Sequence, residues 1–365
     1  MKIFVTGTRG IPNILGGVET HCEELYPLIA EEFNCEITVI LRSSYIVKTE
    51  LRTYRGVKLK SIYAPRSKMF EAIIHSFLAV LWAAICRPDV LHIHAVGPNL
   101  MAPLARIFGL KVVMTHHGPD YERAKWSKAA KLFLKLGEWA GVKFANRVIV
   151  ISEEIKKSLV DKYGRADSIL IPNGVSITGK PVVRYEILKK FDLEKRSYIF
   201  TLGRFVPEKG FDYLIRAYKK TGLSRKYKLV IAGDADHETS YSQELKKQGE
   251  VAGVVFVGFR KGEELAQLFS NCRLFVLPSF YEGLPISLLE AMAYGLQILA
   301  SDIPANLQVN MPSENYYPVG DETVLAQKLV EILENSVVED KTYDLRPYDW
   351  RVIAKSTFEV FKTLK

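Results

Sequence analysis

Residues 273–300 have the sequence RLFVLPSFYEGLPISLLEAMAYGLQILA. The apolar runs at 273–277 and 297–300 predict strands, and the segment between them predicts a loop followed by a helix. Pro285 suits the first helical position because its φ angle is fixed and it has no N–H group to leave unsatisfied. Gly295 suits the position just after the last turn. A strand, a crossing helix and a second strand make up one unit of a parallel sheet.

The same alternation of strand and helix patterns fills most of the chain, which predicts an α/β fold. In the first half, strands are expected at 2–6, 36–41, 57–63, 89–94, 111–116, 147–151 and 167–171. After a polar stretch the alternation restarts, with strands at 197–203, 228–233, 254–257, 273–277 and 297–300. We therefore expect two doubly wound Rossmann-like domains, residues 1–175 and 176–348, facing a cleft, and a last helix at 349–365 that could pack back on the first. Ligands of such sheets bind beyond the carboxyl ends of the strands.

Composition describes an ordinary globular protein, with 48% hydrophobic and 25% charged residues in 365. The four cysteines are scattered, so neither a disulfide framework nor a cysteine zinc site is expected. The chain enters a strand without a signal peptide, and its most apolar segment, 69–86, is too short to span a bilayer. We expect a cytoplasmic protein. The net charge of +9 favours an anionic membrane surface over nucleic acid, because basic and acidic residues are interleaved and no nucleic-acid motif occurs.

The loop before the helix of 285–295 predicts an anion site. The backbone N–H groups of Leu284 and Ile286 lie at the positive end of the helix dipole, where a phosphate would be stabilised. Glu282 and Glu290 flank this point, and since carboxylates repel phosphate they should grip neutral hydroxyls instead. A diphosphate between two polyol ends is a nucleotide sugar. The alternative is that Glu290 is an ordinary helix residue satisfied by a neighbouring arginine or backbone group.

Arg204 and Lys209 are the candidate partners of that diphosphate. They stand five residues apart in a strand-to-helix loop, LGRFVPEKGF, and could reach the same diphosphate. The arginine would bind it through two parallel hydrogen bonds and the lysine as a point charge. Taken singly, each is more often a solvated surface cation. Asp234 and Asp236 could bind Mg²⁺ or Mn²⁺, but we discount this because these two cations already supply the counter-charge.

Two further segments of the first half carry candidate site residues. Gly16 and Gly17 precede a helix expected near Val18 and permit close approach of an anion, although a flexible loop is an equal alternative. His116 and His117 end an apolar strand and should point to opposite faces, so that at most one faces the cleft. No metal is expected, because no third ligand stands at a recognisable spacing.

The segment 123–147 has a basic amphipathic helical pattern. Its lysines fall on one face, at Lys125, Lys128, Lys131 and Lys135. Its apolar residues lie elsewhere, at Trp126, Leu132, Phe133, Leu136 and Trp139. Such a helix can lie on an anionic membrane, and the alternative is a surface helix whose apolar stripe faces the core.

The motifs of the chain occur in an ordered set that spans nearly its whole length. They are GG at 16–17, THHG at 115–118, NGV at 173–175, GRFVPEKG at 203–210, AGD at 232–234, VGF at 257–259 and EGLPISLLEAMAYG at 282–295. This set resembles retaining glycosyltransferase family 4, which has the GT-B fold. The segments at 7–20 and 118–132 further resemble the rhamnosyltransferase-like group of bacterial capsule and lipopolysaccharide assembly.

The resemblance implies roles for residues that match its motifs. Arg204 and Lys209 would hold the donor diphosphate, Glu290 the ribose hydroxyls and Glu282 the transferred sugar. His117 best matches the family histidine near the reacting sugar, with His116 as the second choice. The remaining expected substrate contacts are Gly16, Gly17, Asn173, Phe259, Gly283, Leu284 and Ile286. The sequence departs from the family pattern at two places. Gln297 stands where many relatives have proline, and the loop at 233–238 lacks a second glycine. These departures put only recognition of the nucleotide base in doubt.

The implied activity is transfer of a sugar, with retention, from a nucleoside-diphosphate sugar to a sugar acceptor in cell-surface polysaccharide or lipopolysaccharide biosynthesis. The resemblance implies no cofactor and no metal. A polyprenyl-diphosphate-linked acceptor would give the basic segment a role at the inner face of the plasma membrane. Alternatives are a nucleotide-sugar epimerase or hydrolase of the same fold, a nucleic-acid-binding protein and a catalytically silent GT-B subunit.

Overall fold

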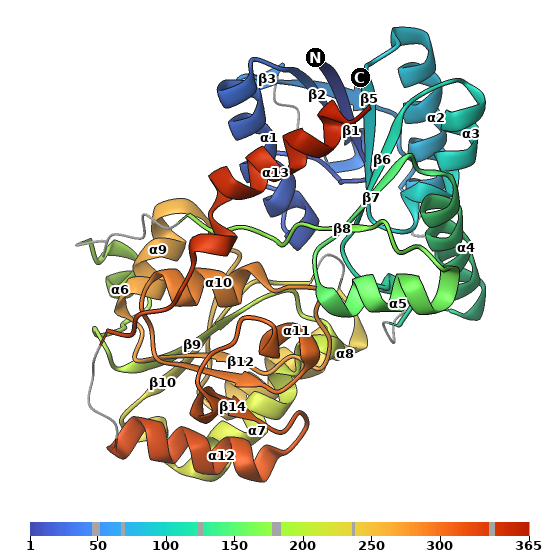
Figure 1. The fold of residues 1–365 in the computed structure, drawn as a ribbon. Coiled ribbons are helices and arrows are strands. Elements are labelled where there is room, and N and C mark those ends of the chain that lie inside the picture. Colours follow the sequence, from blue (N-terminus) through green and yellow to red (C-terminus); the bar gives the residue numbers. More distant parts are fainter. Residues whose placement is uncertain are drawn as a thin grey trace. The chain divides into compact units, whose positions relative to one another are not determined.

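The computed structural model describes residues 1–45, 52–66, 70–122, 127–176, 184–235, 238–335 and 340–364. The chain forms two compact units. Unit 1 consists of Met1–Gly174 and Arg346–Lys365, and unit 2 of Val175–Leu345. Each unit is an α/β domain built on its own sheet (Figure 1). The expected fold class is confirmed.

The sheet of unit 1 has eight strands in the order β3-β4-β2-β1-β5-β6-β7-β8. Their bounds are β1 Lys2–Thr6, β2 Glu36–Arg42, β3 Thr53–Tyr54, β4 Val57–Ile62, β5 Val90–His94, β6 Val112–His116, β7 Arg147–Val150 and β8 Ile169–Leu170. All neighbours are parallel except β3, which pairs antiparallel with β4. The sequence pattern missed β3, a two-residue strand that reaches β4 through a tight turn with positive φ at Arg55 and Gly56.

The sheet of unit 1 is covered by helices at the places where helical patterns were expected. They are α1 Gly17–Phe33, α2 Phe70–Cys86, α3 Ala102–Ile107, α4 Lys128–Phe144, α5 Glu153–Tyr163 and α13 Trp350–Lys362. The C-terminal α13 lies against α1, where the Phe33 and Phe358 rings stack at 4.2 Å (Figure 1). On another side of the sheet, α2, α3 and α4 follow one another. The last residues of the chain thus belong to the core of its first unit.

The sheet of unit 2 has six parallel strands in the order β11-β10-β9-β12-β13-β14. Their bounds are β9 Tyr198–Leu202, β10 Lys228–Ala232, β11 Val255–Gly258, β12 Leu274–Leu277, β13 Ile298–Ser301 and β14 Tyr316–Tyr317. The helices are α6 Glu186–Lys190, α7 Phe211–Thr221, α8 Ser240–Val251, α9 Gly262–Asn271, α10 Ile286–Ala293, α11 Pro304–Leu307 and α12 Glu322–Val330. The sequence predicted every strand of this sheet except β14.

Large apolar side chains fill the core of unit 2. Phe200, Phe205 and Phe211 are almost completely buried, the last two in edge-to-face contact with ring centroids 6.0 Å apart. Because β9 and β12 are central neighbours, the loops that follow them open side by side at one edge of the sheet. Within the described residues, no helix is both long enough and apolar enough to cross a membrane.

Candidate functional site

In unit 2 the loops after β9 and β12 are held together by backbone contacts. The amide of Phe280 donates to the carbonyl of Glu208 at 2.8 Å. Gly210 has φ of +64°, and a Cβ there would lie 2.2 Å from the carbonyl oxygen of Pro278. Only glycine accepts both the backbone angle and this close approach. The two expected donor-binding motifs, GRFVPEKG and EGLP, are therefore fixed against each other.

Lys209 and Glu282 meet at this junction. The Lys209 ammonium donates to Glu282 Oε1 at 2.5 Å, and the Ser279 hydroxyl donates to the same oxygen at 2.7 Å. The two charged side chains are 17% and 12% exposed, so they are largely shielded yet reachable. An ammonium has three donors, and a diphosphate could accept those not directed at Glu282. The structure thus brings the expected diphosphate residue and the expected sugar residue into one contact.

Arg204 stands in the same loop, half-buried, two residues after the end of β9. Around it the loops after β9 and β10 are packed backbone to backbone: the Phe205 amide donates to the Asp234 carbonyl at 3.1 Å, and a Cβ on Gly233 would lie 1.9 Å from the Gly203 oxygen. The Asp234 carboxylate pairs with Lys246 at 3.0 Å, while Asp236 lies outside the described residues. The Asp-x-Asp pair therefore stays a discounted metal site.

The helix after the second loop begins one residue later than predicted. Pro285 is the N-cap, with φ of −74° and ψ of 115°, and α10 starts at Ile286. The expectation that Pro285 takes the first helical position is wrong because its ψ is still extended, although its carbonyl already accepts from the Leu288 amide at 3.1 Å. Gly295, with φ of +62°, follows the last turn as expected.

The other expected substrate contacts of unit 2 lie at the start of α10, on α10 itself and after β11. Leu284 is buried, Gly283 and Ile286 are half-buried, and Phe259 is exposed at the end of β11. Glu290 is half-buried on α10, near the Tyr294 hydroxyl. Burial, and then the charge of Glu290, raises the pKa of Tyr294 to about 12. The loop edge therefore combines cations, carboxylates and amides in one small region.

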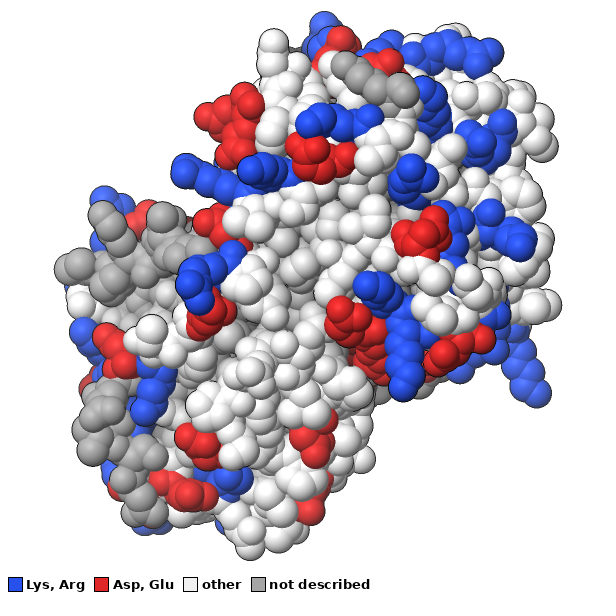
Figure 2. Space-filling view, viewed as in Figure 1, with Lys and Arg blue, Asp and Glu red and all other residues white. Residues whose placement is uncertain are grey.

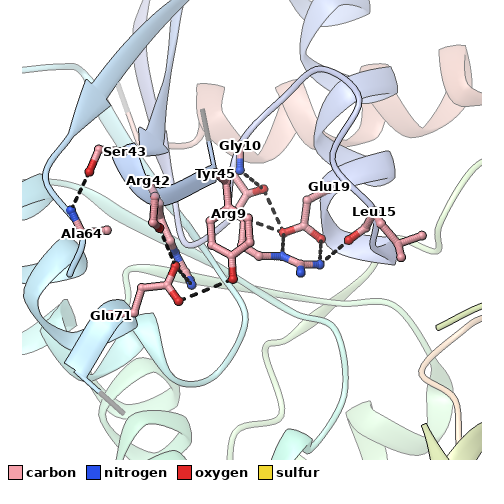
Figure 3. A network of polar contacts seen from close by, with 11 residues as sticks. Arg9, Gly10, Leu15, Glu19, Arg42, Ser43, Tyr45, Ala64 and Glu71 are labelled. Atoms are coloured by element: carbon pink, nitrogen blue, oxygen red, sulfur yellow. Dashed lines mark hydrogen bonds and ion pairs between the residues drawn. The ribbon is translucent and has the colours of Figure 1, made fainter. Parts of the chain in front are cut away.

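In unit 1 the glycine-rich loop after β1 is tied by a buried ion pair. The Arg9 guanidinium bonds both oxygens of Glu19, at 3.2 Å, and also donates to the Leu15 carbonyl (Figure 3). Burial opposes the ionisation of Glu19, but the Arg9 charge and hydrogen bonds outweigh it and lower the pKa of Glu19. Gly16 has φ of +151°, and a Cβ there would lie 2.1 Å from Glu19 Oε2. Gly16 is thus required by the loop itself.

Gly17 differs from its neighbour. A Cβ built there meets no described atom within 4 Å. Space beside Gly17 is compatible with the expected approach of an anion to the start of α1. The contact itself stays a prediction.

His116 and His117 contact different neighbours, as expected for adjacent residues at a strand end. His116 Nε2 lies 2.7 Å from Glu138 Oε1, with both side chains buried. Burial opposes ionisation of Glu138, but hydrogen bonds from His116, Tyr163 and Tyr121 outweigh it and lower its pKa. His116 therefore belongs to a buried polar network.

His117 lies at the end of a chain of hydrogen bonds that the sequence analysis missed. Its Nε2 is 2.9 Å from His94 Nδ1, and His94 Nε2 contacts the Tyr26 hydroxyl. The same hydroxyl is 2.8 Å from His92 Nδ1, and His92 Nε2 is 2.7 Å from the Thr115 hydroxyl. Burial, and then neighbouring histidines, lowers the pKa values of His92 and His117 to about 3. The signal in the sequence was the HIH at 92–94, two histidines on one face of a strand.

Asn173 is the remaining expected site residue of unit 1. Its side-chain oxygen lies 2.9 Å from His21 Nδ1, and a Cβ on the next residue, Gly174, would lie 2.5 Å from the Trp350 ring. Asn173 and His21 are both buried. The NGV motif therefore contacts the first helix of the chain and the last.

The described part of the basic segment, α4, carries apolar side chains on its exposed face. Leu132, Leu136 and Trp139 are exposed at spacings of four and three residues, and the Trp139 ring meets Phe144 at 5.6 Å between centroids. Lys125 and Trp126 lie outside the described residues. Figure 2 shows many Lys and Arg side chains, with interspersed acidic ones, over the side of unit 1 that carries α4.

Beside this face lies a cavity of about 460 Å³. It is lined by Tyr121, Glu122, Lys131, Lys135, Glu138, Lys162 and Tyr163. The Lys162 ammonium donates to the Tyr121 hydroxyl at 2.9 Å. The lining carries three lysines and two glutamates, so the cavity has a small positive formal charge.

Comparison with known proteins identifies the family. Residues 183–346 match the model of glycosyl transferases group 1, and residues 15–178 that of glycosyltransferase family 4. The chain is 30% identical over 329 residues to the UDP-Gal:α-D-GlcNAc-diphosphoundecaprenol α-1,3-galactosyltransferase of Escherichia coli, covering 84% of this chain and 81% of that one. The chain belongs to the glycosyltransferases of group 1 and family 4.

Other relatives of this glycosyltransferase agree with that family. It is 28% identical over 314 residues to the phosphatidyl-myo-inositol mannosyltransferase of Mycobacterium leprae, covering 81% of this chain and 78% of that one. Its GT-B fold is shared by sucrose-phosphate synthase from Thermosynechococcus elongatus, with a TM-score of 0.84, 21% identity and coverage of 100% and 98%. HepE of Anabaena, solved with UDP and glucose, has a TM-score of 0.81, 18% identity and coverage of 99% of both chains. The protein is therefore a glycosyltransferase of GT-B fold.

Proposed function

We propose that this glycosyltransferase moves a sugar, with retention, from a nucleoside-diphosphate sugar to a lipid-linked sugar acceptor in cell-surface polysaccharide or glycolipid biosynthesis. The observation that carries the donor half is the contact of Lys209 with Glu282 beside the start of α10. This contact places a cation that could bind the diphosphate beside a carboxylate that could accept hydrogen bonds from sugar hydroxyls. The names of relatives support this half, since the E. coli enzyme is a UDP-Gal transferase and HepE was solved with UDP-glucose.

The mechanism follows from where charge develops. As the bond from the sugar to the diphosphate breaks, negative charge grows on the leaving group. Arg204, Lys209 and the positive end of α10 would stabilise that charge. These groups supply the counter-charge that a metal supplies elsewhere, so we expect the transfer to proceed without a metal or cofactor.

Retention follows if the acceptor attacks from the face that the leaving group vacates. The acceptor oxygen then forms the new bond to the anomeric carbon while a diphosphate oxygen accepts its proton. Glu282 would hold a hydroxyl of the transferred sugar and Glu290 the ribose, so neither needs to act as a base. His117 is expected near the reacting sugar.

The acceptor half rests on α4 and the cavity beside it. Lys131, Lys135 and Lys162 offer ammonium groups to a diphosphate at the cavity, which Glu122 and Glu138 also line. The exposed Leu132, Leu136 and Trp139 suit a hydrocarbon surface. The E. coli relative is named for a diphosphoundecaprenol acceptor and the mycobacterial one for phosphatidyl-inositol. We therefore place the enzyme at an anionic membrane surface on the inner side of the plasma membrane.

The identity of the transferred sugar is predicted only by the resemblance of two segments. The rhamnosyltransferase-like grouping stays a prediction, since the relatives named above transfer galactose or mannose. The epimerase or hydrolase alternative is not favoured, because the family and its relatives are transferases.

The direct test is a transfer assay in EDTA. Labelled UDP-, GDP- and dTDP-sugars are incubated with a polyprenyl-diphosphate-linked sugar, and the product's anomeric configuration is read by NMR. We expect one donor to give a product with the donor's configuration. An inverted product would disprove retention, release of free sugar would indicate a hydrolase, and loss of activity in EDTA that returns with added metal would disprove metal independence.

Membrane contact is tested by reversing charge on α4. Lys128→Glu with Lys131→Glu should weaken sedimentation with anionic liposomes at least tenfold, since each lysine near such a surface contributes about 1 kcal/mol. The matched control is Lys219→Glu with Lys247→Glu, two exposed lysines of unit 2. Equal sedimentation of both variants and the wild type would sink the membrane proposal.

A further inference from the structure

Three histidines from different parts of unit 1 converge at one point. His21 comes from α1, His94 from the end of β5 and His117 from the loop after β6. One ring nitrogen of each lies within 4.8 Å of the others, and the His21 and His117 rings meet edge to face at 4.9 Å. Two further histidines therefore accompany His117, at spacings that the sequence pattern did not reveal. The two missing partners lie 23 and 96 positions away in the sequence, since 117 − 94 = 23 and 117 − 21 = 96.

We propose that His21, His94 and His117 form a binding site for one divalent transition cation of the zinc class. Neutral imidazole nitrogens are preferred ligands of such cations, and three histidines leave a fourth position of a tetrahedral site open for water or a hydroxyl. The site shares His117 with the sugar contact proposed above, whereas the diphosphate contacts proposed for Arg204 and Lys209 lie in unit 2. It needs neither the proposed donor nor the proposed acceptor to exist.

Contacts around the three rings match those found around metal-bound histidines, whose second nitrogen is usually hydrogen-bonded to an outer partner. The Asn173 side-chain oxygen accepts from His21 Nδ1 at 2.9 Å, which leaves the lone pair on His21 Nε2. His94 Nε2 contacts the Tyr26 hydroxyl, which leaves His94 Nδ1 for the site. Two of the three ligands thus have an outer partner that orients them.

The hydrogen-bond chain behind His94 can supply the required proton position. If His94 carries its proton on Nε2 and donates to Tyr26, the Tyr26 hydroxyl can donate to His92 Nδ1. His92 then carries its proton on Nε2 and donates to the Thr115 hydroxyl at 2.7 Å. Each ring stays neutral and no proton is gained or lost. With this polarity the chain leaves the lone pair of His94 Nδ1 directed at the site.

Distances and charge are both compatible with a metal. Tetrahedral coordination at about 2.0–2.1 Å separates ligand nitrogens by about 3.3 Å. The His94 and His117 nitrogens stand at 2.9 Å, and all three ligand nitrogens lie within 4.8 Å of one another, so side-chain rotation must close the widest separation by no more than about 1.5 Å. Burial also holds the pKa values of His21 and His94 well below the usual range, so these rings are neutral and ready to coordinate at neutral pH.

The test is a titration of tag-free, chelator-treated protein with Co²⁺, followed by visible absorption and by metal analysis. We expect one equivalent to bind and to give the d–d bands of a four- or five-coordinate ion. His21→Gln and His117→Gln should each weaken binding at least tenfold. Asn173→Ala, which keeps all three ligands, should weaken it about 10- to 100-fold because it removes an outer partner.

The matched control is His75→Leu, which removes a buried histidine of α2 outside the cluster and should bind Co²⁺ like the wild type. Circular dichroism confirms that each variant is folded. Absence of stoichiometric binding would overturn the proposal, and so would affinity unchanged in Asn173→Ala and both ligand variants. In either case the three histidines would form a hydrogen-bonded network without metal.

Discussion

The carboxyl ends of the two sheets carry clusters of opposite chemistry. In unit 2, Lys209 and Glu282 form a charged, partly exposed pair. In unit 1, His21, His94 and His117 form a neutral group in which the first two side chains are buried and the third is half-buried. The difference follows from burial. A side chain stays charged where water or a charged partner is within reach, whereas a buried imidazole without either loses its proton. The first cluster suits an anion and the second a metal or a neutral sugar.

The largest expected effect comes from breaking the charged cluster. Lys209→Ala should lower kcat by about 10²–10³, because it removes a preorganised group that stabilises the leaving diphosphate. Lys209→Arg should restore part of the rate. The matched control, Lys228→Ala, removes a lysine at the opposite end of the same sheet and should keep the rate. Equal rates in Lys209→Ala and Lys228→Ala would contradict the account.

Glu290 tests the predicted contact of unit 2 with the ribose of the donor nucleotide. Glu290→Gln should weaken binding of the nucleoside diphosphate about 10- to 100-fold, since hydrogen bonds to charged groups contribute about 1.5–3 kcal/mol. The loss should appear in calorimetric affinity and in KM more than in kcat. A variant with unchanged affinity and a large loss of kcat would move Glu290 from the ribose to the reacting sugar.

His75 tests whether burial keeps a histidine of unit 1 neutral. Burial, and then the Arg42 charge, lowers the pKa of His75 from 6.5 to about 4. Between these values the unfolded chain binds a proton that the native protein does not, so the free energy of unfolding falls as pH drops. The expected slope is about 1.4 kcal/mol per pH unit for this group.

The measurement is urea unfolding of the wild type and His75→Leu from pH 7 to pH 4.5. The variant should lose this part of the slope, because its side chain does not titrate. Parallel curves for the two proteins would show that His75 is not a buried neutral group.

Gly210 tests whether the two loops of unit 2 must touch. Gly210→Ala should destabilise the protein by about 1–3 kcal/mol, because the added Cβ meets the Pro278 carbonyl and the φ is positive. Gly222→Ala is the matched control: its φ is also positive, at +70°, but a Cβ there meets open space, so about 1 kcal/mol is expected. Equal losses in the two variants would remove the argument for close packing.

Sequence patterns predicted the cluster of unit 2 better than that of unit 1. The residues of the former lie in two short motifs, each beside a strong strand pattern, so position along the chain was enough to bring Lys209 and Glu282 together. The histidine cluster of unit 1 forms only when α1, β5 and the loop after β6 come together in the folded chain. No local spacing encodes that contact, so His21 and His94 were missed.

The errors in the fold have similar causes. β3 and β14 have two residues each, too few for a period to be seen. Pro285 was placed one position too far inside its helix, because composition does not fix ψ. The roles of Arg204, Glu282 and Glu290 toward a substrate remain predictions carried by family motifs.

The most direct test of the central claim is thermal unfolding in EDTA with UDP, GDP, dTDP, ADP or NAD. At 100 times its dissociation constant, one nucleoside diphosphate should stabilise the wild type and Lys228→Ala by about 2.7 kcal/mol, and Lys209→Ala clearly less. That result would place the donor diphosphate at the contact of Lys209 with Glu282. Stabilisation by NAD alone, by none of the five, or equally in all three proteins would contradict it.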